Sequence, residues 1–361
     1  MDGSTSRAPM IVVGATGFTG TLVAEALRTR GIPFAIAGRD ATKLAALADV
    51  LGGVERVTVD LDDPRSLDRA FEGRALVSAC AGPFSEVGES VVAAAIRASA
   101  NYVDTTGEQA FVARVVAKYA DVAERRGVAV VPSMAYETAI ADWAAHLASS
   151  RLSGPPTSLD VVYGVDRFRT TRGTKLSILA ALGEATPQQF VDGRLVPEGI
   201  AKERRRVVGR DGDVREALSF PSPEAILVPR HTRARSVRTY AVVGPRALLV
   251  ATAMRGVAPV ASRLLEGFLG GAVARTRRGP DASEREAQTF FVLAEAERGS
   301  ERVAVRATGH DPYGLTAHLH AHAACEILAG RRGAVGVAAP SEVFPFEAAE
   351  PALRAAGVTY V

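Results

Sequence analysis

The sequence predicts an α/β protein: a Rossmann-type doubly wound parallel sheet, followed by a second α/β domain whose sheet is mixed or antiparallel. Short apolar runs alternate with helical patterns up to about residue 152, which is typical of parallel strands joined by helices. Residues 290–297 and 301–309 alternate between apolar and polar side chains around a turn at 298–300. This alternation indicates an antiparallel hairpin with one polar face.

The composition is that of an ordinary soluble globular protein, with 47% hydrophobic and 23% charged residues. A net charge of +3 does not indicate nucleic-acid binding. The two cysteines, Cys80 and Cys325, lie far apart, which predicts neither a disulfide framework nor a metal site and suits a reducing cytoplasm. Residues 1–9 lack the apolar core of a signal peptide, and no run of about 18 apolar residues predicts a membrane span.

The stretch Met10–Gly20, MIVVGATGFTG, organises the first half of the chain. Its first four residues predict a strand, three glycines follow, and a helical pattern begins at Thr21. This is the start of a nucleotide-binding unit, in which a pyrophosphate lies at the helix N-terminus. The first glycine permits the tight turn, the second lets the backbone approach the pyrophosphate, and the third allows close packing of helix on strand. The predicted contacts are Gly14, Thr16, Gly17, Phe18, Thr19 and Gly20.

The residue after the second strand decides between two cofactors. Residues 33–37 predict that strand, and Arg39 follows it where an acidic residue would bind the ribose of NAD. Arg39 offers a planar guanidinium for the 2′-phosphate of NADP, and Lys43 supplies a second cation. In the alternative interpretation, Arg39 is a solvated loop residue and Asp40 caps the next helix. We expect NADPH/NADP as the cofactor.

The loop after the fourth strand predicts a second region of contact with the cofactor. Residues 75–79 form this strand, whose carboxyl end lies beside the sugars and nicotinamide in a doubly wound sheet. Small residues followed by Gly-Pro let the backbone run close to a ligand. Cys80 is interpreted as a buried small residue rather than a nucleophile. The predicted contacts are Ala81, Gly82, Pro83 and Phe84, together with Thr106 after the fifth strand.

These motifs resemble those of the saccharopine dehydrogenase-like oxidoreductases. The resemblance rests on GATGFTG, AGRD, AGPF, GESVVAAA and YVDTTGE, and it continues thinly in Arg172-Gly173-Thr174 with Ser177 and in GHDPYGLTA at 309–317. The bacterial trans-acting enoyl reductases look like the most similar branch. The resemblance implies a Rossmann domain, an α/β substrate domain and NADPH-dependent reduction. Where that branch carries a Gly-Phe-Asp-Ser-type segment after the sixth strand, this chain has Ser133–Thr138, so the substrate need not be the same.

Two domains are predicted, because 361 residues exceed the roughly 250–300 that one core usually supports. A break at Ser153-Gly154-Pro155-Pro156 places a boundary after residue 152. The predicted parts are an NADP-binding domain over residues 8–152, a substrate and dimerisation domain over 153–312, and C-terminal helices over 313–361 that pack back towards the first domain.

The second half leaves alternatives open. Arginines at 204–206, 210, 215 and 230–238 form a basic region, which is either a solvated face or a docking surface for an acidic carrier protein or a coenzyme A phosphate. The apolar residues 247–274 form a core helix, a dimer interface or the lining of a pocket for an acyl or polyketide chain. No metal is expected, because the spacing of three nearby histidines is not that of a zinc site: His318, His320 and His322.

Reduction needs a proton as well as a hydride, and residues near the ends of the fifth and sixth strands are candidates to supply it. Tyr136 is the first choice because it follows the sixth strand, where the nicotinamide should lie, and Glu137 is the second predicted catalytic residue. The alternative role of Tyr136 is packing against the substrate or the nicotinamide. The other candidates are Tyr102, Glu108 and Asp104, the last of which is interpreted as a buried structural carboxylate.

The sequence thus predicts a cytoplasmic NADPH-dependent reductase acting on an activated C=C (enoyl) or C=N (imine) bond in secondary or lipid metabolism. Its substrate is a small molecule or a carrier-bound acyl or polyketide chain. One alternative is a saccharopine-type amino-acid dehydrogenase, with Arg167, Arg169 or Arg172 clamping substrate carboxylates. Another is a non-enzymatic NADP-binding sensor or scaffold. No nucleic-acid partner and no integral membrane span are expected, and a homodimer is one option.

Overall fold

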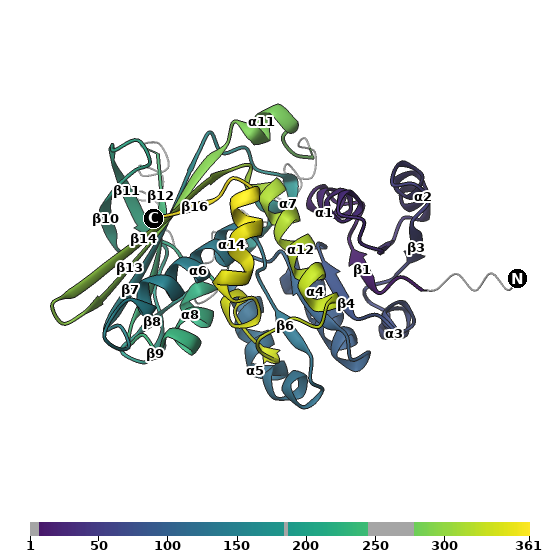
Figure 1. Ribbon diagram of the computed structural model, residues 1–361, viewed down its shortest axis with the longest axis horizontal. Coiled ribbons are helices and arrows are strands. Elements are labelled where there is room, and N and C mark those ends of the chain that lie inside the picture. The colour runs from purple at the N-terminus through teal and green to yellow at the C-terminus, as the bar shows by residue number, and fades with distance from the viewer. Residues whose placement is uncertain (1–6, 184–186, 245–277) are drawn as a thin grey trace, which may run out of the picture. The chain divides into compact units, whose positions relative to one another are not determined.

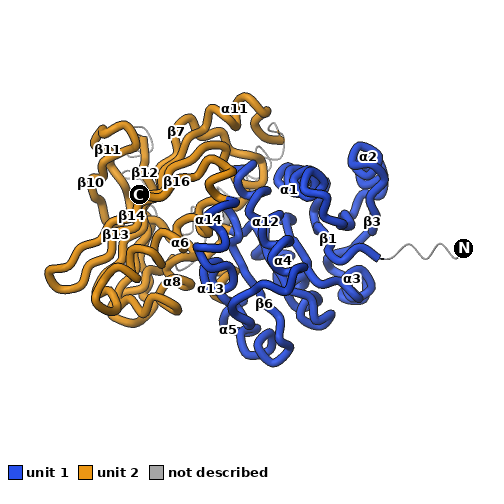
Figure 2. Tube along the Cα trace, in the orientation of Figure 1, with its two compact units in different colours: residues 1–106, 114–135, 313–352 blue, residues 107–113, 136–312, 353–361 orange. Residues whose placement is uncertain are grey.

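The computed structural model describes residues 7–183, 187–244 and 278–361, which divide into two compact units (Figure 2). Unit 1 comprises residues 1–106, 114–135 and 313–352, and unit 2 comprises residues 107–113, 136–312 and 353–361. The units separate after residue 135, whereas the predicted boundary lies after residue 152. The apolar stretch 247–274 lies outside the described residues, so its three interpretations stay predictions.

Unit 1 is built on a parallel sheet of seven strands (Figure 1). Its strand order, β15-β6-β5-β4-β1-β2-β3, is the doubly wound order, in which the connections reverse direction between β1 and β4. This confirms the predicted Rossmann-type sheet. The strands are β1 (Met10–Val13), β2 (Ala35–Gly38), β3 (Glu55–Thr58), β4 (Leu76–Ala79), β5 (Asn101–Asp104), β6 (Ala129–Val131) and β15 (Gly336–Val337).

Helices join these strands, and one of them begins earlier than predicted. The helix expected from Thr21 starts at Phe18, so that prediction was wrong by three residues. Gly20 therefore lies in the first turn of the helix, where a side chain would not fit. The helices are α1 (Phe18–Thr29), α2 (Ala41–Val50), α3 (Pro64–Phe71), α4 (Phe84–Arg97), α5 (Gln109–Arg125), α12 (Pro312–Leu328), α13 (Pro340–Val343) and α14 (Phe346–Ala355).

Unit 2 contains a mixed sheet, as predicted. The order along it is β10-β11-β12-β7-β13-β14-β16, with β8 beside β12 and β9 beside β8. Only β12 and β7 pair in parallel among its described strands. The strands are β7 (Ser158–Asp166), β8 (Gln188–Val191), β9 (Arg194–Pro197), β10 (Arg204–Val208), β11 (Val214–Ser219), β12 (Val237–Val242), β13 (Thr289–Arg298), β14 (Glu301–His310) and β16 (Thr359–Tyr360). The helices are α6 (Tyr136–Ser150), α7 (Arg172–Gly183), α8 (Glu224–Thr232) and α11 (Ala282–Glu286).

Two glycines of this sheet make room for buried aromatic rings. Gly164 of β7 lies opposite Phe291 of β13, and a Cβ on Gly164 would come within 2.1 Å of that ring. Gly309 of β14 lies opposite Phe290, whose ring would be 2.5 Å from the added Cβ. Both rings therefore lie directly over glycine backbone. They can occupy these positions in the core because glycine has no side chain.

Gly164→Ala should lower the free energy of unfolding by about 1–3 kcal/mol, because the ring of Phe291 has to move away from the new methyl group. Urea denaturation followed by circular dichroism measures this loss. Gly199→Ala is the matched control, since nothing lies within 4 Å of its added Cβ. Equal losses in the two variants would contradict the packing argument.

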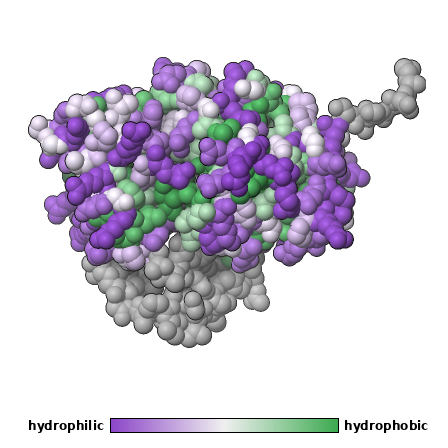
Figure 3. Space-filling view, turned by 90° about the horizontal axis from the view of Figure 1, so that it is seen from below, coloured by the Kyte–Doolittle hydropathy of each residue, from purple (hydrophilic) through white to green (hydrophobic). Residues whose placement is uncertain are grey.

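The face shown in Figure 3 is mostly hydrophilic, with hydrophobic side chains in smaller patches. Two exposed large hydrophobic residues, Val208 and Val214, are paired across β10 and β11. Within the described ranges, no helix combines the length and apolar character needed to cross a bilayer.

Candidate functional site

The turn between β1 and α1 is tight and has no room for side chains at two of its glycines. Gly14 has a positive φ of 76°, and its N–H donates to the carbonyl of Ala37 at 2.9 Å. A Cβ on Gly14 would come within 2.8 Å of the nitrogen of Ala81, and a Cβ on Gly20 within 2.3 Å of the Gly14 carbonyl oxygen. Larger residues would push α1 or the loop after β4 away from the turn. This geometry supports the roles predicted for the first and third glycines.

The N-terminus of α1 is open to an anion. Gly17 is its N-cap, and no side chain caps the helix, so the first N–H groups lack a side-chain acceptor. The hydroxyl of Thr21 instead donates to the carbonyls of Ala15 at 3.0 Å and Gly17 at 2.8 Å. The free N–H groups and the helix dipole suit a pyrophosphate. The other predicted contacts of this turn are half-buried: Thr16, Phe18 and Thr19.

The C-terminal part of unit 1 adds an aromatic ring to this turn. Tyr313, near the start of α12, packs edge-on against Phe18, with 5.3 Å between the ring centroids. Tyr313 belongs to the GHDPYGLTA motif and is the first residue of the segment 313–361, for which packing back towards the first domain was predicted. The contact ties the phosphate turn to a segment almost 300 residues away in the sequence.

Arg39 lies directly after β2 and is exposed. In the part of the chain that the structure describes, it makes no ion pair. Asp40, by contrast, caps α2 by accepting the N–H of Lys43 at 3.0 Å, and it binds the Lys43 ammonium at 2.9 Å. The alternative interpretation of Asp40 as a helix cap is therefore confirmed. Because Lys43 already has a carboxylate partner, Arg39 is the better placed cation for a 2′-phosphate.

The loop after β4 combines an exposed glycine with a buried phenylalanine. Gly82 is exposed, and its added Cβ would make an ordinary contact of 3.5 Å with the ring of Phe84. Phe84 is itself buried and is the first residue of α4, with Pro83 as the N-cap. Burial raises the pKa of Cys80 to about 12, so its thiol stays protonated at neutral pH, as expected of a non-nucleophilic residue.

Asp104 connects the carboxyl ends of β5 and β6. It is fully buried, and its Oδ1 accepts the N–H groups of Thr106 at 2.9 Å and of Ser133 at 2.8 Å. Ser133 has a positive φ of 63°, which costs free energy in a residue other than glycine. This geometry supports the structural role predicted for Asp104. Tyr102 is also fully buried in β5, and burial raises its pKa well above the usual value.

A hydrogen bond in the core of unit 1 was not predicted. The hydroxyl of Ser78 in β4 lies 2.8 Å from Nδ1 of His320 in α12. Burial lowers the pKa of His320 to about 4, so the imidazole is neutral at neutral pH. Across the described residues, no three histidine, cysteine or acidic side chains are grouped so that they could hold a metal ion. The two residues are 242 positions apart, so no local sequence pattern could predict that they meet.

The two predicted catalytic residues begin α6 in unit 2. The ring of Tyr136 packs against that of Phe290, with 5.4 Å between centroids. Glu137 is half-buried, and its Oε1 lies 3.4 Å from where a Cβ on Gly107 would be. Burial raises the pKa of Glu137 to about 7, and the nearby charge of Glu224 adds to this effect. The structure therefore brings Glu137 together with a carboxyl group that the sequence did not single out.

Polar contacts fix the segment that follows Thr106. Glu108 is buried and accepts a hydrogen bond from the hydroxyl of Ser177 at 3.1 Å. Gln109 donates to the carbonyls of Gln188 and Ser222, each at 2.9 Å. Glu108, a candidate proton donor, is thus held by α7, and Ser177, which carried part of the family resemblance, has a structural partner.

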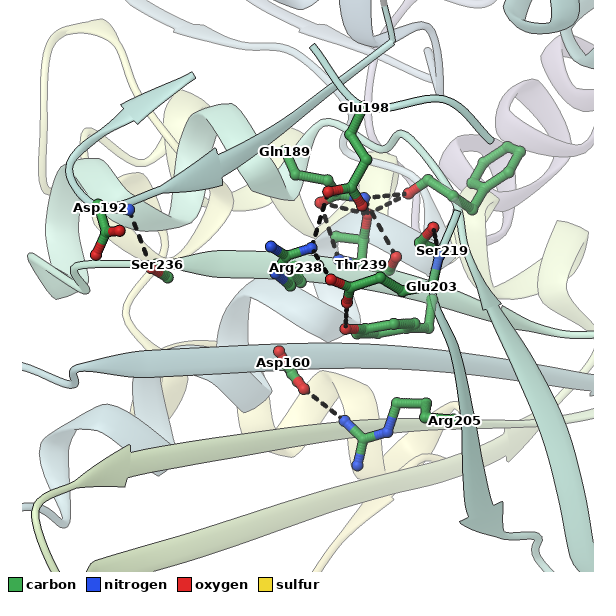
Figure 4. A network of polar contacts seen from close by, with 12 residues as sticks. Asp160, Gln189, Asp192, Glu198, Glu203, Arg205, Ser219, Ser236, Arg238 and Thr239 are labelled. Carbon is green, nitrogen blue, oxygen red and sulfur yellow. Dashed lines mark hydrogen bonds and ion pairs between the residues drawn. The ribbon is translucent and has the colours of Figure 1, made fainter. Parts of the chain in front are cut away.

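Arginines of the basic region are paired with carboxylates (Figure 4). Arg238 binds Glu198 at 2.9 Å and Glu203 at 2.7 Å, and Arg205 binds Asp160 at 2.6 Å. The Arg205 contact links β10 to β7, and the Arg238 contacts link β12 to the segment between β9 and β10. Neutralised arginines favour a salt-bridged face of the sheet over a docking surface for an acidic partner.

Residues 10–131 match the family model described as the saccharopine dehydrogenase NADP binding domain. A saccharopine dehydrogenase-like oxidoreductase of Arabidopsis thaliana is 33% identical over 61% of this chain and 54% of its own length. A Mycobacterium tuberculosis protein, provisionally assigned as a trans-acting enoyl reductase, is 28% identical over 49% of this chain and 45% of its own length. This level of identity does not single out the enoyl reductase branch.

Among solved structures, saccharopine dehydrogenase (L-Glu forming) from Saccharomyces cerevisiae covers 98% of this chain and 99% of its own, with a TM-score of 0.64 and 14% identity. This likeness shows a shared fold. The chain spans 54% of the Arabidopsis relative, 45% of the Mycobacterium relative and 39% of a human saccharopine dehydrogenase-like oxidoreductase. Residues 10–131 are therefore an NADP-binding domain of the saccharopine dehydrogenase type, and the whole chain has the saccharopine dehydrogenase fold.

Proposed function

We propose that the protein is an NADPH-dependent reductase that acts on an activated C=C or C=N bond. The observation that carries this proposal is the β1–α1 turn, where Gly14 before α1 and Gly20 in its first turn have no room for a Cβ and no side chain caps the helix N-terminus. Such a turn suits the pyrophosphate of a dinucleotide, and Arg39 after β2 suits the 2′-phosphate of NADP. The oxidoreductase names of the relatives support the same reaction class.

Different residues of the chain bind different parts of NADPH. The α1 N-terminus holds the pyrophosphate, the guanidinium of Arg39 holds the 2′-phosphate, and the exposed backbone at Gly82 allows close approach of the sugar and nicotinamide. Bound NADPH supplies the hydride. Several expectations stay predictions. They are the substrate, which is a small molecule or a carrier-bound acyl or polyketide chain, and a role in secondary or lipid metabolism. A cytoplasmic location and a homodimer also stay predictions.

Single-turnover oxidation of protein-bound NADPH tests this proposal. The purified protein is mixed with stoichiometric NADPH and then with a panel of enoyl thioesters and cyclic imines, and the absorbance of the reduced nicotinamide is followed. We expect rapid loss of absorbance with at least one of the two classes, which also decides between C=C and C=N reduction. Tight NADPH binding without oxidation by any substrate would favour the sensor or scaffold instead.

A saccharopine-type amino-acid dehydrogenase is the second candidate. It is favoured by exposed arginines of unit 2, because a guanidinium group can bind a carboxylate through two hydrogen bonds. Arg167 and Arg169 lie between β7 and α7, and Arg172 is the first residue of α7. In the same assay, oxidation of NADPH only by an α-keto acid together with an amino acid would support this candidate, in which the reduced C=N bond forms from the two substrates, and would exclude enoyl thioesters and cyclic imines as substrates.

Gly82→Val should weaken NADPH binding at least about tenfold without unfolding the protein. The protein itself has space for the side chain, because Gly82 is exposed and its Cβ makes only ordinary contacts, whereas a ligand lying against the backbone would be displaced. Fluorescence titration gives the Kd, and the melting temperature reports stability. Gly199→Val, in open space, is the control. An unchanged Kd in Gly82→Val would remove this loop from the cofactor site.

A further inference from the structure

Backbone N–H groups at the start of α1 form the expected pyrophosphate site. The first hydrogen bond within this helix joins the N–H of Thr21 to the carbonyl of Gly17 at 3.0 Å. The N–H groups of residues 18–20 therefore precede the hydrogen-bonded part of the helix, and they are the groups that an anion can meet. Phe18 is the first helical residue and is half-buried. Because its N–H is one of these groups, the position of Phe18 affects where they point.

The ring of Phe18 rests on Tyr313, which comes from the C-terminal part of unit 1. The two rings meet edge-on, with 5.3 Å between their centroids and 81° between their planes. This T-shaped arrangement places the positive edge of one ring against the negative face of the other, which is a preferred geometry of aromatic pairs. Tyr313 is only 9% exposed, so its ring is enclosed by the core. The buried ring is therefore the fixed partner, and the half-buried ring of Phe18 is the one that it supports.

The helix that carries Tyr313 is itself attached to the sheet. Nδ1 of His320, which is fully buried in α12, lies 2.8 Å from the hydroxyl of Ser78 in β4. Tyr313 and His320 are seven residues apart, or about two helical turns, so they share one face of α12. β4 pairs with β1, the strand that leads into the turn before Phe18. This face of α12 thus contacts both sides of the switch point between β1 and β4, where doubly wound sheets bind their ligands.

We infer that Tyr313 is a positioning residue for the cofactor: its ring holds Phe18, and with it the N-terminus of α1, in the orientation that binds the pyrophosphate. The inference deepens the proposed function and rests on its cofactor alone, since neither the substrate nor the hydride is involved. All of these residues belong to unit 1, which is blue in Figure 2. Tyr313 lies outside residues 10–131, the segment that matches the NADP-binding family model. The C-terminal segment therefore supplies a part of the cofactor site that this match does not include.

Cofactor affinity tests the role of Tyr313. Tyr313→Leu keeps a buried apolar side chain but removes the ring, so a smaller fraction of the protein has its turn in the binding orientation, and the Kd rises in proportion. From the free energy of an aromatic pair, we expect the Kd for NADPH to rise roughly 2- to 12-fold in fluorescence titrations of the full chain. The Kd for NADH should rise by the same factor, because both cofactors carry the pyrophosphate. Tyr313→Phe keeps the ring and should restore both affinities.

A double-mutant cycle distinguishes positioning through Phe18 from an independent effect. Phe18→Leu should weaken the binding of both cofactors to a similar degree, and adding Tyr313→Leu to it should cause no further loss. Leu319→Ala, which removes a buried side chain of the same helix outside the ring pair, is the control for general destabilisation of α12. It should lower the melting temperature and leave both Kd values unchanged. All titrations are made well below the melting temperature of each variant.

Three outcomes would each overturn the inference: an unchanged Kd in Tyr313→Leu, additive losses in the double variant, or an equal loss in Leu319→Ala. If Tyr313→Leu does not fold, Phe18→Leu decides instead, because this residue is half-buried, and an unchanged Kd in that variant would overturn the inference. A wild-type protein that binds NADPH but reduces no substrate would contradict the reductase proposal alone. A wild-type protein that binds neither cofactor would overturn both.

Discussion

Asp104→Ala should lower the free energy of unfolding by about 3–6 kcal/mol. The substitution removes two hydrogen bonds from buried backbone N–H groups to a carboxylate, those of Thr106 and Ser133, and each such bond contributes about 1.5–3 kcal/mol. The positive φ of Ser133 would then lose the contact that helps to hold it. Urea denaturation of the wild-type and variant proteins measures the difference.

Asp104→Asn is the matched control. Its side-chain oxygen still accepts both N–H groups but lacks the charge, so the loss should be less than half of that caused by alanine. If alanine and asparagine destabilise the protein equally, the two hydrogen bonds are not what Asp104 contributes. If neither variant changes stability, the structural role of Asp104 would be refuted. Asp104 would then become a candidate for the proton donor again.

Arg39→Ala should weaken NADPH binding by about 1.5–3 kcal/mol, or roughly 10- to 150-fold, and should leave NADH binding almost unchanged. The reason is that the exposed guanidinium, which has no carboxylate partner among residues 7–183, 187–244 and 278–361, is available for the 2′-phosphate that only NADPH carries. Fluorescence titration with both cofactors gives the two Kd values.

Arg56→Ala, which removes another exposed arginine of unit 1, serves as the control for a general loss of positive charge. It should change the two affinities by less than twofold. Equal affinity of the unmodified protein for NADPH and NADH would refute the assignment of Arg39, because the 2′-phosphate would then have no specific partner.

The parts of the fold that the sequence predicted are those set by local pattern. β1 lies at the predicted residues Met10–Val13, because a short apolar run before glycines has few alternatives to a buried parallel strand. The hairpin of β13 and β14 was equally clear, since alternation of apolar and polar residues is a direct consequence of strand geometry. In the candidate site, the turn residues Gly14 and Gly20 were predictable because positive φ and close packing restrict these positions to glycine.

The contacts missed by sequence reasoning join residues that are distant along the chain. Ser78 and His320 are 242 positions apart, and Glu137 and Glu224 interact electrostatically from the packed helices α6 and α8. No local periodicity encodes such pairs. The start of α1 at Phe18 instead of Thr21 also depends on packing: Gly20 has low helix propensity, but its backbone lies against the β1–α1 turn in the first turn of the helix.

The chain passes several times between the two units, and this limits how the protein can be shortened. The chain crosses from one unit to the other after residues 106, 113, 135, 312 and 352. A fragment truncated at residue 131 would carry the whole matched NADP-binding segment but would lack β15, the strand that pairs with β6. It would also lack His320, so the hydroxyl of Ser78 would lose its partner. Such a fragment would expose an unpaired edge strand prone to self-association, so a useful minimal protein must retain the C-terminal segment, either as part of the full chain or grafted on by circular permutation.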